Sequence, residues 1–393
     1  GLKISKPTDI TNLFISIKKI DQGSSIDHVV SQFPKVKRNF LFLVIQEYYR
    51  NYENNNKILL NYVHDKTPKN ILTLLKISLT LLYFSNKPQY AIVNDAVQEG
   101  KNLKKEKLVN AVLRNILRNK NKIKYGKFIY PNFKRVLDKI FSSDSIRNYI
   151  YSTIFTKPKN YQISLIDNQK AIYKKRVFIL EKKIMKECFV QDIGNFEVIY
   201  SVRKFFKDKT LIDVCAAPGG KSILLNSFDY NVIAIDNSQS QINKFKENLD
   251  RLNVNINIQK VDFLKAQFTQ KYNSILLDAP CSALGTFRRN PDVTLKIDQS
   301  KIKKHQKIQI QMIEKSLKIL NKKGFLVYIV CSFHPFETIE VIDKIMQKHK
   351  NIKLHKINSH KMIKRQSGYF INPLSFKELG GSDIFFVSVL EKI

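Results

Sequence analysis

The feature that most constrains the fold is a series of short β-rich runs that alternates with helical stretches after Thr210. The runs are Leu211–Ala217, Val232–Asp236, Ile256–Asp262, Ser274–Asp278 and Phe325–Val330. Helical stretches at Gln239–Leu252 and Ile302–Leu320 separate several of them. Strands that alternate with helices form a parallel sheet covered on both faces. This part of the chain therefore predicts an α/β sheet whose ligands bind at the carboxyl ends of its strands.

The first third of the chain has apolar residues at the i, i+3, i+4 spacing of amphipathic helices. The expected helices are Arg38–Tyr52, Ile71–Phe84, Ala91–Gly100 and Leu108–Arg118. Residues from Pro131 to Phe206 are mixed, and we expect two helices followed by short strands there. We divide the chain into a helical domain at 1–125, a linker with a small α/β subdomain at 126–205, and an α/β domain at 206–393.

Charge and cysteine content narrow the class of protein. The 393 residues include 68 Lys and Arg against 33 Asp and Glu, and the formal net charge of +35 favours a polyanionic partner. An AT-rich genome also produces many Lys, Asn and Ile codons, so the charge supports a nucleic-acid partner without establishing one. The four cysteines are too few for a disulfide framework, and no Cys or Cys/His pair has the spacing of a zinc site. We therefore predict a reducing compartment and no metal.

We expect no membrane segment. The longest apolar stretch, Ile71–Phe84, is interrupted by Lys76 and is shorter than the ~20 residues that a membrane span needs. The amino-terminal residues lack the apolar core of a signal peptide. The chain begins with Gly1 and not with Met, so we expect it to be trimmed or incomplete at that end. The expectation is a soluble, cytoplasmic monomer.

A glycine-rich turn follows the first β-rich run. The segment Ala217–Ser222 contains Gly219 and Gly220 and precedes a helix, so the backbone can approach a ligand at the helix amino terminus. A P-loop would need Gly in place of Cys215, and a G-x-G-x-x-G dinucleotide motif is absent. Asp236 ends the next run, where a carboxylate can accept both hydroxyls of a ribose. Together these features indicate S-adenosylmethionine, an adenosine ligand without a pyrophosphate; the alternative is a plain helix cap beside a solvated Asp.

Two cysteines lie at the ends of neighbouring β-rich runs. Cys281 belongs to the sequence Asp278-Ala-Pro-Cys-Ser282, and Cys331 follows the run that ends at Val330. Both thiols can face one substrate, although a free thiol is often just a small buried apolar group. Methylation of a pyrimidine at C5 suits this arrangement, because a thiolate that adds to C6 makes C5 nucleophilic enough to attack a methyl sulfonium. Loss of the C5 proton and of the thiolate then calls for a second acid/base group.

Several segments resemble the Sun/Fmu-type RNA cytosine-C5 methyltransferases. They are Leu211–Ser222, Asp278–Asp292 and Val327–Ser332, with further similarity in Phe189–Asp192 and Ser382–Leu390. Two helical segments resemble the NusB-like RNA-binding domain of the bacterial enzymes that methylate a cytosine of small-subunit ribosomal RNA. They are Pro88–Val97 and Leu108–Arg114. The resemblance implies a multidomain chain: an all-α NusB-like domain, then a Rossmann-like class I methyltransferase domain with seven strands, the last antiparallel.

The resemblance also implies roles for individual residues. Cys331 would be the nucleophile that adds to C6, Cys281 would help to resolve the adduct, and Asp278 would also touch the cytosine edge. DNA cytosine-C5 methyltransferases use the cysteine of the Pro-Cys pair instead, which spacing alone would favour. The residues that would hold S-adenosylmethionine are Cys215, Ala216, Ala217, Pro218, Gly219, Gly220, Lys221, Asp236, Asp262 and Asp278. The family's Thr-Cys-Ser, Pro-Glu-Glu-Asn and Asp-Gly-Phe-Phe motifs are replaced by Val330-Cys-Ser332, Pro335-Phe-Glu-Thr338 and Asp383-Ile-Phe-Phe386.

Basic residues could contact the RNA. Arg288 and Arg289 follow Cys281 closely and are placed to meet phosphates near the target base. Other basic residues could extend this track, although a solvated face is the ordinary explanation for a single lysine. They are Lys35, Lys37, Arg38, the run Lys120–Lys127, Lys301, Lys303 and Lys304. The target base must leave any stack to reach Cys331, so we expect single-stranded or partly unfolded RNA as the substrate.

The resulting hypothesis is methyl transfer from S-adenosylmethionine to C5 of a cytosine in small-subunit (16S) ribosomal RNA, free or in an assembly intermediate, through an adduct between Cys331 and C6. Two alternatives stay open: the same chemistry on transfer RNA, and an RNA-binding ribosome-assembly factor that has lost catalysis. The NusB-like segment argues against the first. The presence of Cys281, Cys331, Asp236 and the Gly219–Gly220 turn argues against the second.

Overall fold

The computed structural model describes residues 7–393, which form two compact units. The helical unit contains the described residues up to Lys134 together with Asn290–Leu295, and the α/β unit contains Arg135–Arg289 and Lys296–Ile393. The three-part division proposed from the sequence stays a prediction. The expected absence of a signal peptide falls in part on residues 1–6, outside the described range.

Seven α-helices build most of the helical unit within the described residues. They are α1 (Asp9–Asp21), α2 (Ile26–Ser31), α3 (Lys35–Arg50), α4 (Tyr52–Leu59), α5 (Lys69–Phe84), α6 (Gln89–Asn102) and α7 (Glu106–Arg118). Helix α5 is central, because it is buried along most of its length and packs against α1, α3, α4, α6 and α7. Lys76 interrupts the apolar sequence of α5, and its Nζ lies 3.8 Å from the ring centroid of Tyr52. Burial lowers the pKa of Lys76 to about 8. No helix among the described residues is long and apolar enough to cross a membrane.

The four helices predicted in this unit are confirmed as α3, α5, α6 and α7. Pro34, Pro68 and Pro88 directly precede α3, α5 and α6, where the fixed φ of proline suits the start of a helix. The sequence analysis did not predict α1, α2 or α4. Helix α4 buries the polar residues Asn54 and Asn55, so its inward face does not show the apolar periodicity that predicts a helix from sequence.

A short segment of the later sequence belongs to the helical unit. Pro291–Leu295 forms a 3₁₀ helix, η5, that contacts α3, and Leu295 packs against the apolar core of the helices. The chain therefore passes between the two units after Lys134, after Arg289 and again after Leu295.

The main sheet of the α/β unit has nine strands within the described residues. They are β4 (Thr210–Asp213), β5 (Asn231–Asp236), β6 (Asn257–Lys260), β7 (Tyr272–Asp278), β8 (Leu320–Val330), β9 (Ile352–Leu354), β10 (Ile363–Arg365), β11 (Gly368–Ile371) and β12 (Phe385–Lys392). Their order is β10-β11-β12-β8-β7-β4-β5-β6, with β9 beside β12. Strands β4 to β8 pair in parallel, and the last strand, β12, is antiparallel to β8. The antiparallel last strand was expected, but the expected number of seven was too low, because β9 and β10 are extra strands of three residues each.

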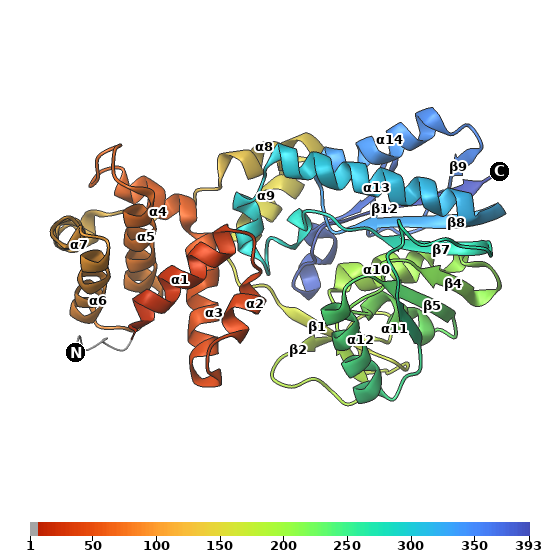
Figure 1. The fold of residues 1–393 in the computed structure, drawn as a ribbon, viewed down its shortest axis with the longest axis horizontal. Helices are drawn as coiled ribbons and strands as arrows, with labels where there is room; N and C mark the ends of the chain where they lie inside the picture. The colour runs from red at the N-terminus through yellow and green to blue at the C-terminus, as the bar shows by residue number, and fades with distance from the viewer. Residues whose placement is uncertain (1–6) are drawn as a thin grey trace. The chain divides into compact units, whose positions relative to one another are not determined.

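Helices cover both faces of this sheet, as the strand–helix alternation predicted (Figure 1). One face carries α10 (Ile193–Val202), α11 (Gly220–Asn226) and α12 (Gln239–Leu252), and the other carries α13 (Gln299–Ile319) and α14 (Ile339–Lys348). The carboxyl ends of β4, β5, β7 and β8 lie at one edge, because parallel strands end on the same side of a sheet.

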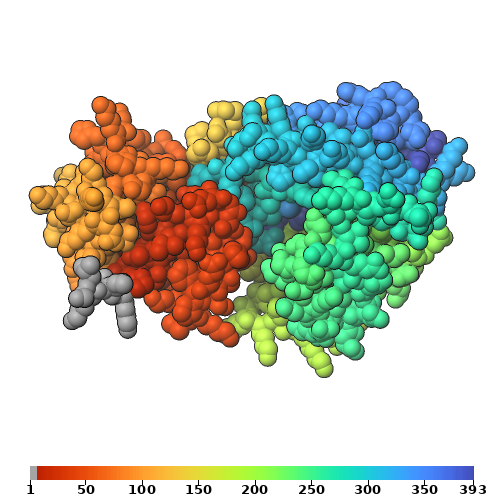
Figure 2. Space-filling view, viewed as in Figure 1, coloured from red at the N-terminus to blue at the C-terminus, as the bar shows by residue number. Residues whose placement is uncertain are grey.

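A small three-stranded antiparallel sheet precedes the main sheet. It contains β1 (Asn160–Ser164), β2 (Val177–Leu180) and β3 (Cys188–Val190) in the order β2-β1-β3, after helices α8 (Pro131–Ile140) and α9 (Asp144–Ile154). This confirms two helices followed by short strands. Strand β3 contacts α12, and in the space-filling view the yellow-green segment of the small sheet lies beside the green helices (Figure 2).

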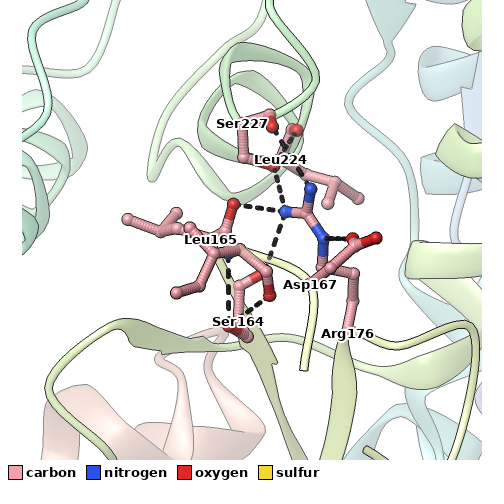
Figure 3. Close-up of polar contacts among 7 residues, drawn as sticks. Ser164, Leu165, Asp167, Arg176, Leu224 and Ser227 are labelled. Carbon is pink, nitrogen blue, oxygen red and sulfur yellow. Dashed lines mark hydrogen bonds and ion pairs between the residues drawn. The ribbon is translucent and has the colours of Figure 1, made fainter. Parts of the chain in front are cut away.

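Arg176 ties the small sheet to α11 (Figure 3). Its side chain is only 9% exposed, and its Nε donates a hydrogen bond to Asp167 Oδ1 at 2.7 Å. Its Nη1 donates to the carbonyl oxygens of Ser164 and Leu165 and to Ser227 Oγ, the last at 3.2 Å. Because Ser227 caps the carboxyl end of α11, these contacts hold the helix that begins at the glycine-rich turn.

We expect Arg176→Met to lower the free energy of unfolding by about 2–4 kcal/mol, because buried acceptors would lose a charged donor. Urea denaturation followed by circular dichroism measures this change. The exposed neighbour Lys182 offers a matched control, and Lys182→Met should leave the unfolding free energy unchanged. Equal effects of the two substitutions would contradict the structural role of Arg176.

Candidate active site

The two cysteines singled out from the sequence meet at the carboxyl edge of the main sheet. Strands β7 and β8 are adjacent and parallel, with Asp278 opposite Ile329. Cys281 and Cys331 follow these strands, and their Sγ atoms lie 3.6 Å apart, within hydrogen-bond distance. The expectation that both thiols face one place is therefore confirmed.

The two thiols are not equivalent. Cys281 has a pKa well above its ordinary value, because it forms a hydrogen bond with Cys331 and is buried, with further contributions from the charges around it, including Glu337. Cys281 therefore keeps its proton at neutral pH. In such a pair, the sulfur that keeps its proton can act as an acid, and the other sulfur can act as a nucleophile toward a substrate.

The glycine-rich turn leaves no room for a larger residue. Gly219 has a φ of +103°, and a Cβ at this position would lie 2.0 Å from the ring of Phe245. Gly220 starts α11, and Ser222 in its first turn donates a hydrogen bond of 2.7 Å to the buried Asp213. Burial raises the pKa of Asp213 to about 7. The path of the backbone at the start of α11 is therefore fixed from both sides.

Asp236 lies where the sequence placed it, at the end of β5. Its Oδ2 accepts a hydrogen bond from the Ala217 backbone N–H at 3.0 Å, and its Oδ1 accepts one from the Ser238 N–H at 2.9 Å. Each oxygen retains a second lone pair. The carboxylate is thus held in one orientation while it can still accept hydrogen bonds from a ligand.

A cavity of about 320 Å³ opens beside this carboxylate. It is lined by Val214, Cys215, Ala217, Asp236, Asn237, Val261, Asp262, Phe263, Asp278, Ala279, Pro280, Cys281, Ala283, Met312 and Cys331. Asp236 and Asp262 are acceptors for hydroxyl or amino groups, while Phe263, Pro280 and Met312 offer apolar surface for a flat ring. This set of side chains fits an adenosine ligand with a positively charged substituent.

A second cavity, of about 260 Å³, shares Ala217, Asp278 and Cys331 with the first. Its lining includes Gln191, Asn195, Lys221 and Arg289. Lys221 donates a hydrogen bond of 2.6 Å from Nζ to Asp278 Oδ2. Burial opposes the charge of Lys221, but the Asp278 carboxylate raises its pKa above the ordinary value. Two cavities that meet at one thiol can hold a group donor and an acceptor on either side of it.

The predicted donor-binding residues divide between the two cavities. Cys215, Ala217, Asp236, Asp262 and Asp278 line the first, and Ala216, Ala217, Pro218, Gly219, Gly220, Lys221 and Asp278 line the second. The individual roles of these residues stay predictions.

The two predicted RNA-contacting arginines both bond to other groups of the protein. Arg288 is 2% exposed and donates to the carbonyl oxygens of Ser382 at 2.7 Å and Gly380 at 3.2 Å. Arg289 lines the second cavity and forms an ion pair with the buried Asp383. A phosphate at Arg288 would have to displace these internal contacts. The structure therefore gives Arg288 a role in holding the loop before β12, and its contact with RNA stays a prediction.

Sequence reasoning missed Glu337, which joins the two cysteine turns. Its Oε1 accepts a hydrogen bond from the Ser282 N–H at 2.7 Å, and its Oε2 accepts from Ser282 Oγ at 2.6 Å and Ser332 Oγ at 2.5 Å. The signal available was the segment Pro335–Thr338, which the resemblance had already marked as a motif.

Comparison with known proteins identifies the α/β unit. Residues 203–391 match the family described as 16S rRNA methyltransferase RsmB/F, and residues 12–118 match the NusB family. The α/β unit therefore carries the RsmB/F methyltransferase domain. The helical unit carries the NusB domain that the sequence predicted, and the α/β unit is a Rossmann-like methyltransferase fold. Members of this family are S-adenosylmethionine-dependent enzymes, so the chain is a methyltransferase of that class.

Two relatives and one solved structure illustrate the similarity. The probable ribosomal RNA small subunit methyltransferase B of Coxiella burnetii is 27% identical over 337 residues, which are 74% of this chain and 77% of that protein. The ribosomal RNA small subunit methyltransferase B of Photorhabdus laumondii is 33% identical over 208 residues, 52% of this chain and 46% of that protein. The crystal structure of PH0851 covers 97% of both chains with a TM-score of 0.73 at 15% identity, and so shares the fold.

We expect Gly219→Ala to weaken binding of S-adenosylmethionine by at least about 30-fold, because its Cβ would overlap the Phe245 ring and displace the turn whose Ala217 N–H holds Asp236 in the first cavity. Isothermal titration calorimetry measures the affinity. Gly23→Ala is a matched control, since Gly23 has a similar φ of +116° but no atom within 4 Å of the new Cβ. Unchanged affinity in Gly219→Ala would show that the turn does not shape the donor site.

Proposed function

We propose that the protein transfers a methyl group from S-adenosylmethionine to C5 of a cytosine in small-subunit ribosomal RNA. The observation that carries this proposal is the pair of thiols 3.6 Å apart at the junction of two cavities. The names of the Coxiella and Photorhabdus relatives support the choice of RNA.

The first cavity suits the methyl donor. S-adenosylmethionine supplies an electrophilic methyl group on a sulfonium. Asp236 and Asp262 would accept hydrogen bonds from the ribose and the base, and Phe263 and Pro280 would contact the adenine ring. The carboxylates of Asp236 and Asp262 also favour a ligand that carries a positive charge in this cavity.

The second cavity suits the target base, with Cys331 as nucleophile. The Cys331 thiolate forms a bond to C6, and the electron pair of the C5–C6 double bond forms the bond from C5 to the methyl group. The bond between the methyl group and the donor sulfur breaks, and its electrons remain on that sulfur as a neutral thioether, S-adenosylhomocysteine. The thiol of Cys281 then passes its proton to the departing Cys331 sulfur and receives the C5 proton. The electrons of the C5–H bond restore the double bond as the C6–S bond breaks. The pair gains one proton in the cycle and releases it to solvent.

The helical unit suits recruitment of the RNA. Its match to the NusB family and the net charge of +35 both favour a polyanionic partner. The cytosine must leave any base stack to enter a cavity of about 260 Å³, so an unpaired or transiently opened nucleotide is the expected target.

We expect the purified protein to transfer label from S-adenosylmethionine to unmodified 16S ribosomal RNA and to yield 5-methylcytidine after digestion to nucleosides. Cys331→Ala should lower the rate by at least about 10³-fold, because it removes the thiolate that adds to C6. Cys281→Ala should instead accumulate a protein–RNA adduct that survives a denaturing gel.

Transfer RNA and partly assembled small-subunit particles serve as alternative substrates in the same assay. Label in transfer RNA alone would overturn the choice of ribosomal RNA. Failure of the wild-type protein to bind S-adenosylmethionine would overturn the proposal as a whole and favour an assembly factor without catalysis. Full activity of Cys331→Ala together with loss in Cys281→Ala would reverse the two cysteine roles.

A further inference from the structure

Glu337 lies at the centre of a hydrogen-bond cluster that the proposed reaction does not yet use. It ends the 3₁₀ helix η6 (Pro335–Glu337), just after β8, and its side chain is fully buried. Its backbone carbonyl accepts a hydrogen bond of 2.7 Å from the hydroxyl of Tyr328, a residue of β8. The backbone of Glu337 is therefore fixed to β8 by a contact that does not involve the two cysteines.

Both partners of the Glu337 carboxylate adjoin a cysteine. Ser282 follows Cys281 and offers its N–H and its hydroxyl, and Ser332 follows Cys331 and offers its hydroxyl. Hydrogen bonds to an ionised acceptor are about twice as strong as neutral ones. One buried carboxylate thus connects the turn after β7, which carries Cys281, with the turn after β8, which carries Cys331.

We propose that Glu337 is a positioning residue that holds the Cys281 and Cys331 turns at the separation needed to release the methylated base. This inference rests on the proposed function, because it concerns the step in which Cys281 exchanges protons with Cys331. A displacement of about 1 Å between reacting groups is enough to slow a reaction about 100-fold.

The charge of Glu337 supports the same assignment. It is one of the causes that raise the pKa of the neighbouring Cys281 thiol. Removal of this charge would lower that pKa, so Cys281 would lose its proton at a lower pH than in the wild type. A residue that only filled space would change neither the pKa nor the fate of the adduct.

Glu337→Gln tests the proposal, because it keeps the volume and one acceptor oxygen while it removes the charge. At saturating RNA we expect release of the methylated RNA, and with it steady-state turnover, to slow about 10- to 100-fold, with the affinities for RNA and S-adenosylmethionine within twofold of wild type. A larger fraction of the protein should remain as RNA adduct on a denaturing gel. Glu340→Gln, three residues later, is the matched control and should behave like wild type.

Alkylation by iodoacetamide gives a readout that needs no RNA. Peptide mass spectrometry over a pH range should show Cys281 reacting at a lower pH in Glu337→Gln than in wild type. Wild-type rate, adduct level and Cys281 alkylation in Glu337→Gln would overturn the proposal. If wild type does not methylate RNA but the alkylation shift is observed, the positioning role stands and the proposed function fails.

A second, independent observation lies in the helical unit. A cavity of about 410 Å³ opens between α4 and the segment that follows α7. It is lined by Asn54, Lys57, Ile58, Asn61, Tyr62, Asn119, Lys122, Ile123, Lys124, Gly126 and Phe128. Two buried asparagines fix its wall: Asn54 Oδ1 accepts from the Phe128 N–H at 2.7 Å, and Asn55 Oδ1 accepts from the Tyr125 hydroxyl at 3.0 Å.

The lining has the chemistry of a nucleotide site. It includes three lysines and no carboxylate. Lys57 Nζ lies 4.6 Å from the ring centroid of Phe128, and Tyr62 adds a second aromatic side chain. Lys122 and Lys124 have no ion-pair partner within residues 7–393. Aromatic rings stack on bases, lysines bind phosphates, and the volume lies in the usual range of ligand sites.

We infer that this cavity receives a nucleotide of single-stranded RNA. The inference deepens the proposed function, since it names a place in the helical unit that binds a nucleotide other than the target cytosine. The lysines of the run Lys120–Lys127 differ in whether they line the cavity. Lys122 and Lys124 line it, whereas Lys120 donates a hydrogen bond to the Leu82 carbonyl at 3.2 Å and lies over the Tyr83 ring.

The double substitution Lys122→Glu and Lys124→Glu in the full chain tests this site with a fluorescent single-stranded RNA and no methyl donor. We expect affinity to fall at least about 10-fold and the salt dependence of log Kd to fall by about 2, one for each lysine. Phe128→Ala should weaken binding by about 5-fold or more with the salt dependence unchanged.

Lys101→Glu with Lys107→Glu changes the charge of the same unit equally, at exposed positions outside the cavity. Equal loss of affinity in this control and in the cavity variant would overturn the site, because it would report net charge alone. RNA binding that depends on the cavity in a protein without methyltransferase activity would uphold the site and contradict the proposed function.

Discussion

The parallel pairing of β7 with β8 is the constraint on which the active site depends. It sets Asp278 opposite Ile329, so that the turns after the two strands leave the sheet side by side. The same edge receives the ends of β4 and β5, which carry the glycine-rich turn and Asp236. One edge of one sheet therefore supplies the thiols, the acidic groups and the turn. A shift of β8 relative to β7 by a single residue would separate the sulfur atoms and break the Glu337 contacts together.

Charge is distributed differently inside the site and over the chain. The chain as a whole carries a formal net charge of +35, yet the interior of the α/β unit is rich in carboxylates. Burial, with repulsion from Asp383 next, raises the pKa of Asp192 to about 7, while Arg289 pairs with the buried Asp383 and Lys221 pairs with Asp278. A cationic methyl donor is attracted by an acidic interior, whereas RNA is attracted by a basic exterior. Negative potential in the site thus favours the methyl donor, and positive potential over the surface favours RNA.

The sequence predicted the elements whose pattern is local. Strands β4 to β8 and helix α12 were predicted because short apolar runs alternate with amphipathic ones, and the meeting of Cys281 and Cys331 followed from that alternation. Glu337 could not be found in this way, because its partner Ser282 lies far from it in the sequence. Arg288 was expected to face RNA because a sequence does not distinguish a guanidinium that holds backbone carbonyls from one that faces a phosphate. Helix α4 escaped prediction because it buries asparagines.

The segment Asn290–Leu295 belongs to the helical unit although it follows Cys281 closely in the sequence. Leu295 packs on the helical core, and Val293 is buried. A truncation at Lys134 would therefore uncover an apolar stretch in the middle of the remaining polypeptide, and such a fragment would tend to aggregate. The two units therefore do not correspond to two separate stretches of sequence, and recombination at a single point cannot exchange one unit as a whole. Gene fusions that combine halves of different relatives are expected to succeed only when this stretch is taken from the same parent as the helices.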